Sequence, residues 1–193
     1  ALIYEIVWTR MLTLVFGHTV FSISIVLAAF MAGLGLGSYL FGYAADRLSI
    51  NSTDSSTNAL NVYGLIEILI FVNGALLSLL FSNFSGVYSL FNSYIPESAN
   101  LQNLLKIFFS FTLMLIPTTL MGATLPLITK YCVTNDKRIG KQVSLLYALN
   151  TLGAAFGCII TGFFLIETFG VLQTVLFAAC INLLVGISAM SMY

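Results

Sequence analysis

Six long apolar stretches constrain the fold of this chain more than any other feature. A helix needs about 20 apolar residues to cross the hydrocarbon core of a bilayer. Of the 193 residues, 59% are hydrophobic and 7% are charged, whereas a soluble domain carries roughly 25% charged residues. A soluble domain of this length has too little interior to bury so much apolar surface. The sequence therefore predicts an all-α integral membrane protein.

We expect a single multi-pass domain over residues 1–193, a bundle of about six transmembrane helices. The first span is the shortest, and we expect it to be truncated at its N-terminus. The spans are 1–16, 20–45, 60–81, 104–128, 143–166 and 169–192.

Basic residues are distributed unevenly among the loops between these spans. If the spans alternate in direction, loops 46–58 and 129–142 lie on one side of the membrane, and Lys106 borders the other side. Cytoplasmic loops carry an excess of Lys and Arg. We therefore expect both loops and the C-terminus to be cytoplasmic, in an inner or plasma membrane. The basic residues of the two loops are Arg47, Lys130, Lys137, Arg138 and Lys141. The formal net charge is zero, which gives no indication of nucleic-acid binding.

The second span contains four glycines within ten residues, in the segment GLGLGSYLFG. A dinucleotide-binding loop requires GxGxxG between a strand and a helix, but these glycines lie in an unbroken apolar run. In steps of four residues, Ala29, Gly33 and Gly37 line one face of a helix. Small residues at this spacing allow helices to approach closely in lipid. We interpret this face, and the similar face of Gly153 and Gly157 in the fifth span, as helix-packing surfaces.

Four polar residues inside the spans are candidates for a solute-binding site: Glu5, Arg10, Glu67 and Asn150. Charged residues in membrane spans usually face the protein interior. Glu5 and Arg10 are about 140° apart on an ideal helix, so each needs a partner elsewhere. Two interpretations remain open. The four residues either form hydrogen bonds between helices or line a cavity for a polar or cationic solute.

Three further features of the spans carry weaker expectations. Trp8 suggests that its part of the first span lies near the membrane interface. Pro117 and Pro126 predict a kinked or locally unwound fourth span, which is typical of transporter sites but also of ordinary membrane helices. Asn182 lies in the middle of the sixth span.

The sequence contains no nucleophile–base pair, no paired carboxylates and no cluster of metal ligands. The cysteines Cys132, Cys158 and Cys180 lack metal-binding spacing and are interpreted as packing residues. We therefore expect no metal and no cofactor, and the sequence leaves open whether the protein is an enzyme.

Four segments together carry a resemblance to a known family: LIYEIVWTRMLTLVFG, FMAGLGLGSYLFGYAADR, PTTLMGATLPLITKY and LYALNTLGAAFGCIITGFFLI. They resemble the membrane half of fused major-facilitator/spermidine-synthase-like (polyamine aminopropyltransferase-like) proteins. Asp46 and Arg47 resemble the acidic–basic loop motif of major facilitators. In the family a soluble catalytic domain follows the membrane helices. Nothing up to Tyr193 matches its cofactor loop or catalytic aspartates, so no catalytic residue is carried over. The resemblance implies importance for Glu5, Trp8, Arg10, Gly33–Gly37, Asp46–Arg47, Gly122–Pro126 and Asn150–Gly153.

Three functions are compatible with this sequence. The first is a transporter-like membrane module that binds or moves a small polar or cationic solute, with a polyamine as the candidate implied by the resemblance. The second is a membrane anchor or accessory subunit that docks a partner protein. The third is the membrane part of an aminopropyltransferase-like enzyme whose catalytic domain lies beyond Tyr193. The bilayer is the expected partner, and six spans, half of a twelve-helix facilitator, are compatible with a homodimer or other membrane subunits.

Overall fold

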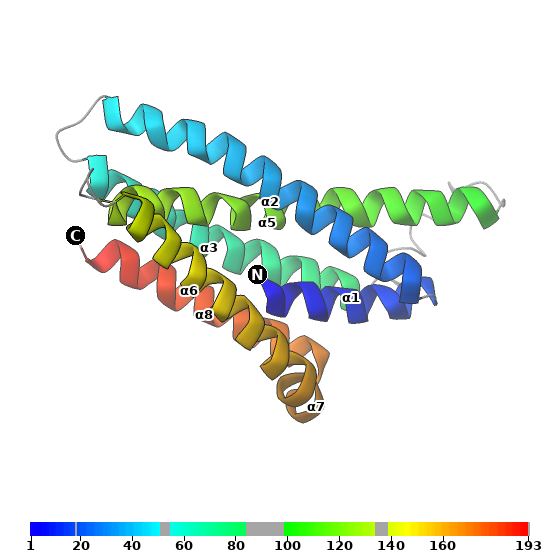
Figure 1. Ribbon diagram of the computed structural model, residues 1–193. Coiled ribbons are helices and arrows are strands. Elements are labelled where there is room, and N and C mark those ends of the chain that lie inside the picture. Colours follow the sequence, from blue (N-terminus) through cyan, green and yellow to red (C-terminus); the bar gives the residue numbers. More distant parts are fainter. Residues whose placement is uncertain (18, 51–54, 84–98, 134–138, 193) are drawn as a thin grey trace.

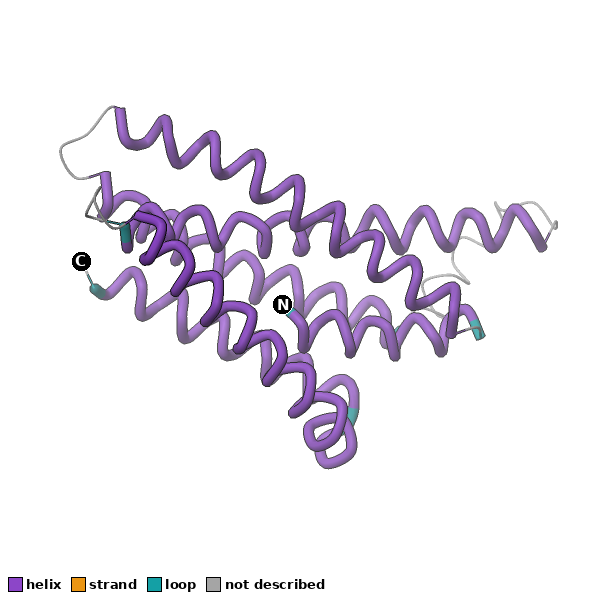
Figure 2. Tube along the Cα trace, in the orientation of Figure 1, coloured by secondary structure: helices purple, strands orange, loops and turns teal. Residues whose placement is uncertain are grey.

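The computed structural model describes residues 1–17, 19–50, 55–83, 99–133 and 139–192, and every regular element among them is a helix (Figures 1 and 2). Five helical segments are long and apolar enough to cross a membrane, which confirms the predicted all-α, multi-pass membrane fold. The helices are α1 (Leu2–Phe16), α2 (Thr19–Ile50), α3 (Ser55–Ser82), α5 (Ala99–Cys132), α6 (Ile139–Ile160), α7 (Ile166–Phe169) and α8 (Val171–Ser191).

The helices extend beyond the apolar spans predicted from sequence. α2 continues to Ile50 and α3 begins at Ser55, so most of the predicted loop 46–58 is helical. The predicted loop 129–142 is likewise helical at both of its ends, up to Cys132 and from Ile139. Hydropathy marks the part of a helix that lies in lipid, whereas the backbone hydrogen bonds of a helix are local and continue into water.

Two glycines with positive φ end helices. Gly17 has φ 70° and donates its N–H to the Thr13 carbonyl oxygen at 2.9 Å, which closes α1. Gly170 has φ 81° and donates to the Ile166 oxygen at 3.0 Å, which separates α7 from α8. Other residues rarely adopt this left-handed region.

A short π-helical turn, Thr161–Leu165, joins α6 to α7 without a break. The helical rod therefore runs from Ile139 to Phe169, longer at both ends than the predicted span 143–166. Gly170 marks the boundary with the sixth span, α8.

The helices form a bundle in which α2 crosses α5, and α3 packs between α5 and α8 (Figure 1). The end of α2, the start of α3, the end of α5, the start of α6 and the end of α8 all lie at one end of the bundle. The helical parts that flank both predicted basic loops therefore lie on the same side.

The core is centred on Trp8 of α1, which is fully buried. Its Nε1–H donates to Ser78 Oγ of α3 at 2.9 Å, and Ser78 in turn donates to the Gly74 carbonyl oxygen at 2.7 Å. The Trp8 ring lies 5.2 Å from that of Tyr4 and 5.7 Å from that of Phe30, centroid to centroid. Trp8 faces the bundle interior because α1 packs its aromatic face against α2 and α3. The expectation that this part of α1 lies near the membrane interface stays a prediction.

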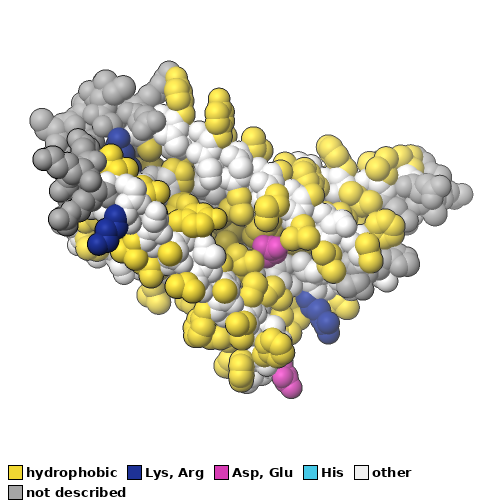
Figure 3. Space-filling view, viewed as in Figure 1, with side chains coloured by type: hydrophobic (Ala, Val, Ile, Leu, Met, Phe, Trp, Pro, Cys, Tyr) yellow, Lys and Arg dark blue, Asp and Glu magenta, His cyan; other side chains and the backbone are white. Residues whose placement is uncertain are grey.

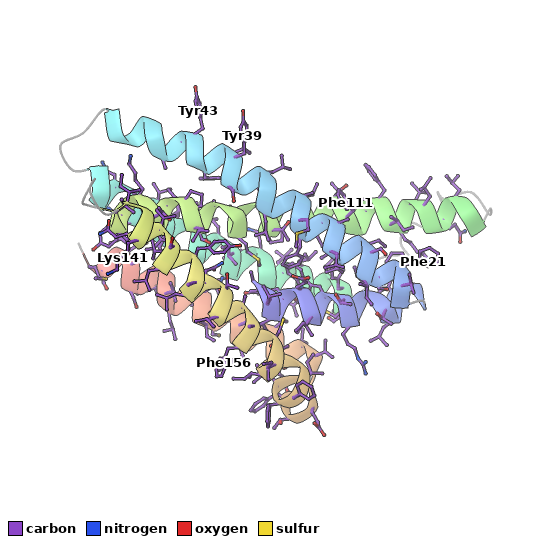
Figure 4. All side chains as sticks on the ribbon, viewed as in Figure 1. Phe21, Tyr39, Tyr43, Phe111, Lys141 and Phe156 are labelled. Carbon is purple, nitrogen blue, oxygen red and sulfur yellow. The ribbon has the colours of Figure 1, made fainter. Side chains whose placement is uncertain are left out.

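Large apolar side chains cover much of the outer surface (Figure 3). Tyr39 and Tyr43 project away from α2, and Phe156 projects from α6 (Figure 4). These three side chains are all exposed, Phe156 to 67%. Such a surface is suited to hydrocarbon, where no hydrophobic drive forces these side chains inward.

Candidate solute site

A cavity of about 560 Å³ lies between the helices, within the size range of ligand pockets. Its wall is formed by the start of α1 together with α2, α3, α5, α6 and α8. Two of the four candidate residues, Glu67 and Asn150, line it. Figure 3 shows a hollow on this face of the molecule, with an acidic side chain beside it. The cavity therefore brings together polar groups that lie far apart in the sequence.

Glu67 supplies the carboxylate of this wall. It lies on α3 and is only 8% exposed. Tyr63, one helical turn earlier, shares a side-chain hydrogen bond with it, in which the phenolic O–H donates because a carboxylate only accepts. The described lining residues include no Lys, Arg or His side chain, but the α-amino group of Ala1 lies on the same wall and interacts electrostatically with Glu67. The wall therefore presents a buried carboxylate that is hydrogen-bonded to Tyr63 and lies near the α-amino group of Ala1.

Asn150 of α6 and Asn182 of α8 add two carboxamides to the same cavity. Asn150 is exposed and Asn182 is half-buried. Each carboxamide offers both a donor and an acceptor. Carboxylate and carboxamide groups thus come from α3, α6 and α8, and Ser38 of α2 and Thr124 of α5 add hydroxyl groups to the same wall.

The two candidates on α1 are not part of this wall. Glu5 is half-buried and Arg10 is exposed, and neither lines the cavity. Only the first three residues of α1 reach it. The structure therefore does not bring Glu5 and Arg10 together with Glu67 and Asn150 on this wall, because the rotation of α1 directs its Tyr4 and Trp8 face into the bundle.

The glycine face of α2 lies directly against α5. A Cβ atom at Gly33 would overlap Thr118, and one at Gly37 would overlap the Thr119 carbonyl oxygen. In the opposite direction, a Cβ at Gly122 would lie 2.7 Å from Leu34 Cα. Ala29, on the same face, is fully buried. The two backbones are therefore in contact where no side chain separates them.

The α2–α5 contact also accommodates Pro126. A proline has no N–H, so the carbonyl oxygen of Gly122, four residues earlier, loses its donor within the helix. The Ser38 hydroxyl of α2 donates to this oxygen at 3.0 Å. α5 remains α-helical through both Pro117 and Pro126, so the expected local unwinding is not found. The kink at these prolines stays a prediction.

The second predicted glycine face, on α6, is not packed in this way. A Cβ at Gly153 would meet no atom within 4 Å, and one at Gly157 would meet only Ile3, at 3.7 Å. Both glycines line the cavity instead. The packing predicted for Gly153 is therefore not found, because α6 stands away from the other helices along the cavity.

The remaining candidates add no further site. Asp46 and Arg47 lie in the helical backbone of α2, but their side chains are outside the described part of the structure. Cys132, Cys158 and Cys180 are free thiols. Within the described residues, no group of three His, Cys, Asp or Glu side chains is placed to hold a metal ion.

Four polar residues of the wall were not selected as solute-site candidates from the sequence: Ser38, Tyr63, Thr124 and Asn182. Tyr63 could have been found, because it precedes Glu67 by four residues and residues at that spacing meet on a helix. Asn182 is a carboxamide in an apolar span, which is the same signal that selected Asn150. Ser38 gave no comparable signal.

Comparison with known proteins gave no further guide to this site. No protein-family model, no curated protein and no solved structure matches the chain.

Proposed function

We propose that the chain is a transporter-like membrane module that binds or moves a small polar or cationic solute through the cavity of Glu67 and Asn150. The resemblance noted in the sequence leads us to propose further that it is the membrane module of a spermidine-synthase-like protein. Glu5 and Arg10 are left out of this proposed site because they do not line the cavity.

One observation carries the proposal: Glu67 is a buried carboxylate inside a membrane span, and it lies on the wall of a cavity together with Asn150 and Asn182. A buried charge is costly unless it is paired. Ionisable residues within membrane spans typically mark solute or ion pathways for this reason. A small polar or cationic solute would find hydrogen-bonding groups in Glu67, Asn150 and Asn182.

The experiment that tests the proposal is thiol labelling at position 150. A variant with Cys132→Ser, Cys158→Ala and Cys180→Ala receives Asn150→Cys and is placed in liposomes with a trimethylammonium methanethiosulfonate reagent. We expect labelling at least tenfold faster than for a matched Phe156→Cys variant, because Phe156 points away from the bundle on the same helix (Figure 4). Equally slow labelling of both variants would show that no water-accessible path reaches position 150, and this result would contradict the proposed function.

The membrane orientation follows from the same proposal. The ends of α5 and α6 that carry Lys130 and Lys141 lie at one end of the bundle with the end of α8. We assign this end to the cytoplasm of a cell with an inner or plasma membrane, since cytoplasmic loops are rich in Lys and Arg. Protease cleavage of an epitope tag at the C-terminus, in vesicles of known sidedness, checks this assignment.

The second candidate function is a membrane anchor or accessory subunit, and the exposed surface of α6 favours it. Large apolar side chains along the rod are exposed, among them Leu145, Leu152, Phe156 and Phe163. A partner helix or a second copy of the chain would bury such a face as effectively as lipid does. Cysteine crosslinking from Leu152→Cys in native membranes tests this, since an anchor predicts a specific crosslinked product and a lipid-facing surface predicts none.

A further inference from the structure

Within the described residues, the turn Thr161–Leu165 between α6 and α7 is the only π-helical segment (Figure 1). π turns are rare, occur mostly as single turns inside α-helices, and frequently lie at functional sites. We propose that this turn is a two-state hinge at which α6 rotates about its own axis relative to α8. The hinge is a property of the helix, and it does not depend on whether a solute enters the cavity.

The π turn holds one residue more than the α turn that it replaces. The N–H of Ile166 donates to the Thr161 carbonyl oxygen, five residues earlier, whereas an α-helix joins residues that are four apart. If the same residues adopt α geometry, the helix on one side must rotate by about 100°, the turn of one α-helical residue. α8 is held in the bundle by buried residues from Thr174 to Ala189, so α6 takes up the rotation.

The side chain of Thr161 lacks a hydrogen bond in the present state. Thr161 is fully buried, and its Oγ1 has no hydrogen-bond partner among the described residues. The π turn contacts α1 and α8, and Thr161 is not among the residues that line the cavity. An unsatisfied buried hydroxyl raises the free energy of the state that contains it. The π state is therefore less stable than its packing alone would make it.

Other threonines of the described helices show how such a hydroxyl is satisfied in regular α geometry. Six of them donate to the carbonyl oxygen four residues earlier, at distances between 2.7 and 2.9 Å. They are Thr9, Thr13, Thr112, Thr118, Thr151 and Thr174. The corresponding acceptor for Thr161 is the carbonyl oxygen of Gly157. A rotation that carries Thr161 out of its buried contact allows this bond, so the hydroxyl favours the rotated state.

The outer side of the π turn leaves room for the rotation. A Cβ atom at Gly162 would meet no atom within 4 Å. The next two side chains, Phe163 and Phe164, are both exposed on the outside of the bundle. The turn can therefore change its geometry on this side without displacing a packed side chain.

The test is pulsed electron–electron double resonance in lipid nanodiscs, on the full chain with its three cysteines replaced as above. Spin labels at Leu145→Cys on α6 and Ile187→Cys on α8, two exposed positions, report the rotation. We expect two distance populations for this pair. The control pair is Leu76→Cys on α3 with Ile187→Cys. It should give one population, because α3 and α8 pack against each other.

Thr161→Val tests the cause of the two populations. Valine keeps the branched shape of threonine but removes the unpaired hydroxyl of the π state and the hydrogen bond of the rotated state. We expect the rotated population, whose distance departs from that of the structure, to fall about fivefold relative to the other. Thr151→Val is the matched control on α6. The Thr151 hydroxyl donates to the Tyr147 oxygen at 2.9 Å within one rigid helix, so this variant should leave the ratio unchanged.

Deletion of Gly162 tests the geometry. It removes the extra residue, so the segment becomes a regular α-helix while α6 keeps its present orientation. We expect a single population at the distance of the structure, and the α3–α8 label pair together with circular dichroism checks that the variant folds. Two populations that persist after the deletion would overturn the inference.

Two further outcomes would also overturn it: a single population in the parent chain, or a population ratio that is the same in Thr161→Val as in Thr151→Val. Neither result bears on the proposed function, which stands or falls with the labelling of Asn150→Cys. Slow labelling of Asn150→Cys together with two populations that respond to Thr161→Val would leave the hinge in place without the solute path.

Discussion

The Ser38 hydroxyl of α2 donates a hydrogen bond of 3.0 Å to the carbonyl oxygen of Gly122 on α5, the oxygen that Pro126 leaves without a donor in its own helix. In lipid no water replaces a missing backbone donor, so such an oxygen needs a partner from the protein. One helix therefore completes the hydrogen bonding of the other at the point where glycines bring their backbones into contact.

Ser38→Ala should destabilise the protein because it leaves the Gly122 oxygen without this donor. We expect a loss of about 0.6–1.7 kcal/mol, the range of interhelical hydrogen bonds in membranes, measured by SDS-induced unfolding in mixed micelles. Pro126→Ala restores an N–H to the same oxygen, so Ser38→Ala should cost much less in a Pro126→Ala background. If the effects of the two substitutions on the unfolding free energy are additive, Ser38 does not replace the donor that the Gly122 oxygen loses at Pro126.

Gly37→Ala should weaken the α2–α5 contact. Its Cβ would overlap the Thr119 oxygen and lie 2.9 Å from Gly122 Cα, and backbone atoms have no rotamer by which to move aside. We expect a loss of about 1–3 kcal/mol, as for overpacked cores. Gly35→Ala is the control on the same helix, where a Cβ meets nothing within 4 Å. This control should be neutral or slightly stabilising, since alanine favours helix. Equal unfolding free energies of the two variants would refute the contact.

Ser78→Ala should leave the buried indole N–H of Trp8 without its acceptor. An unsatisfied buried donor costs about 1–3 kcal/mol, and we expect a destabilisation in this range. Trp8 is the single tryptophan of the chain, so its fluorescence should also shift to shorter wavelength as its surroundings become less polar. Ser188→Ala is the control, because the Ser188 hydroxyl is exposed and donates within α8 to Leu184 at 2.7 Å. An unchanged emission spectrum in Ser78→Ala would contradict the hydrogen bond.

Gly153→Leu should fill part of the cavity without destabilising the fold. Nothing lies within 4 Å of a Cβ at this position, and Gly153 lines the cavity. We expect slower labelling of Asn150→Cys, by about tenfold, with an unfolding free energy within about 0.5 kcal/mol of the parent. Gly162→Leu serves as the control, since its Cβ also meets nothing within 4 Å but Gly162 is outside the cavity wall. Equal labelling rates in both variants would mean that Gly153 does not border the access path.

The sequence was sufficient to predict the class of fold and most helices. Apolar runs of about 20 residues predict membrane helices because lipid requires every backbone group to be paired within the protein. The small-residue spacing of Ala29, Gly33 and Gly37 likewise indicated which face of α2 lies against another helix. Each of these inferences depends on residues that lie within one helical span. The local sequence pattern is therefore enough to predict the helix and its packing face.

The sequence alone determined that Glu5, Arg10, Glu67 and Asn150 are polar residues in apolar spans, but only the tertiary structure decided which of them share a cavity. It placed Glu67 and Asn150 on one wall with Asn182, left Glu5 and Arg10 outside, and packed the glycines of α2 while leaving Gly153 of α6 open. The position of a residue along a helix follows from local hydrogen bonds. The direction in which it points within the bundle depends on how each helix is rotated and crossed against its neighbours, and side chains distant in the sequence set that packing.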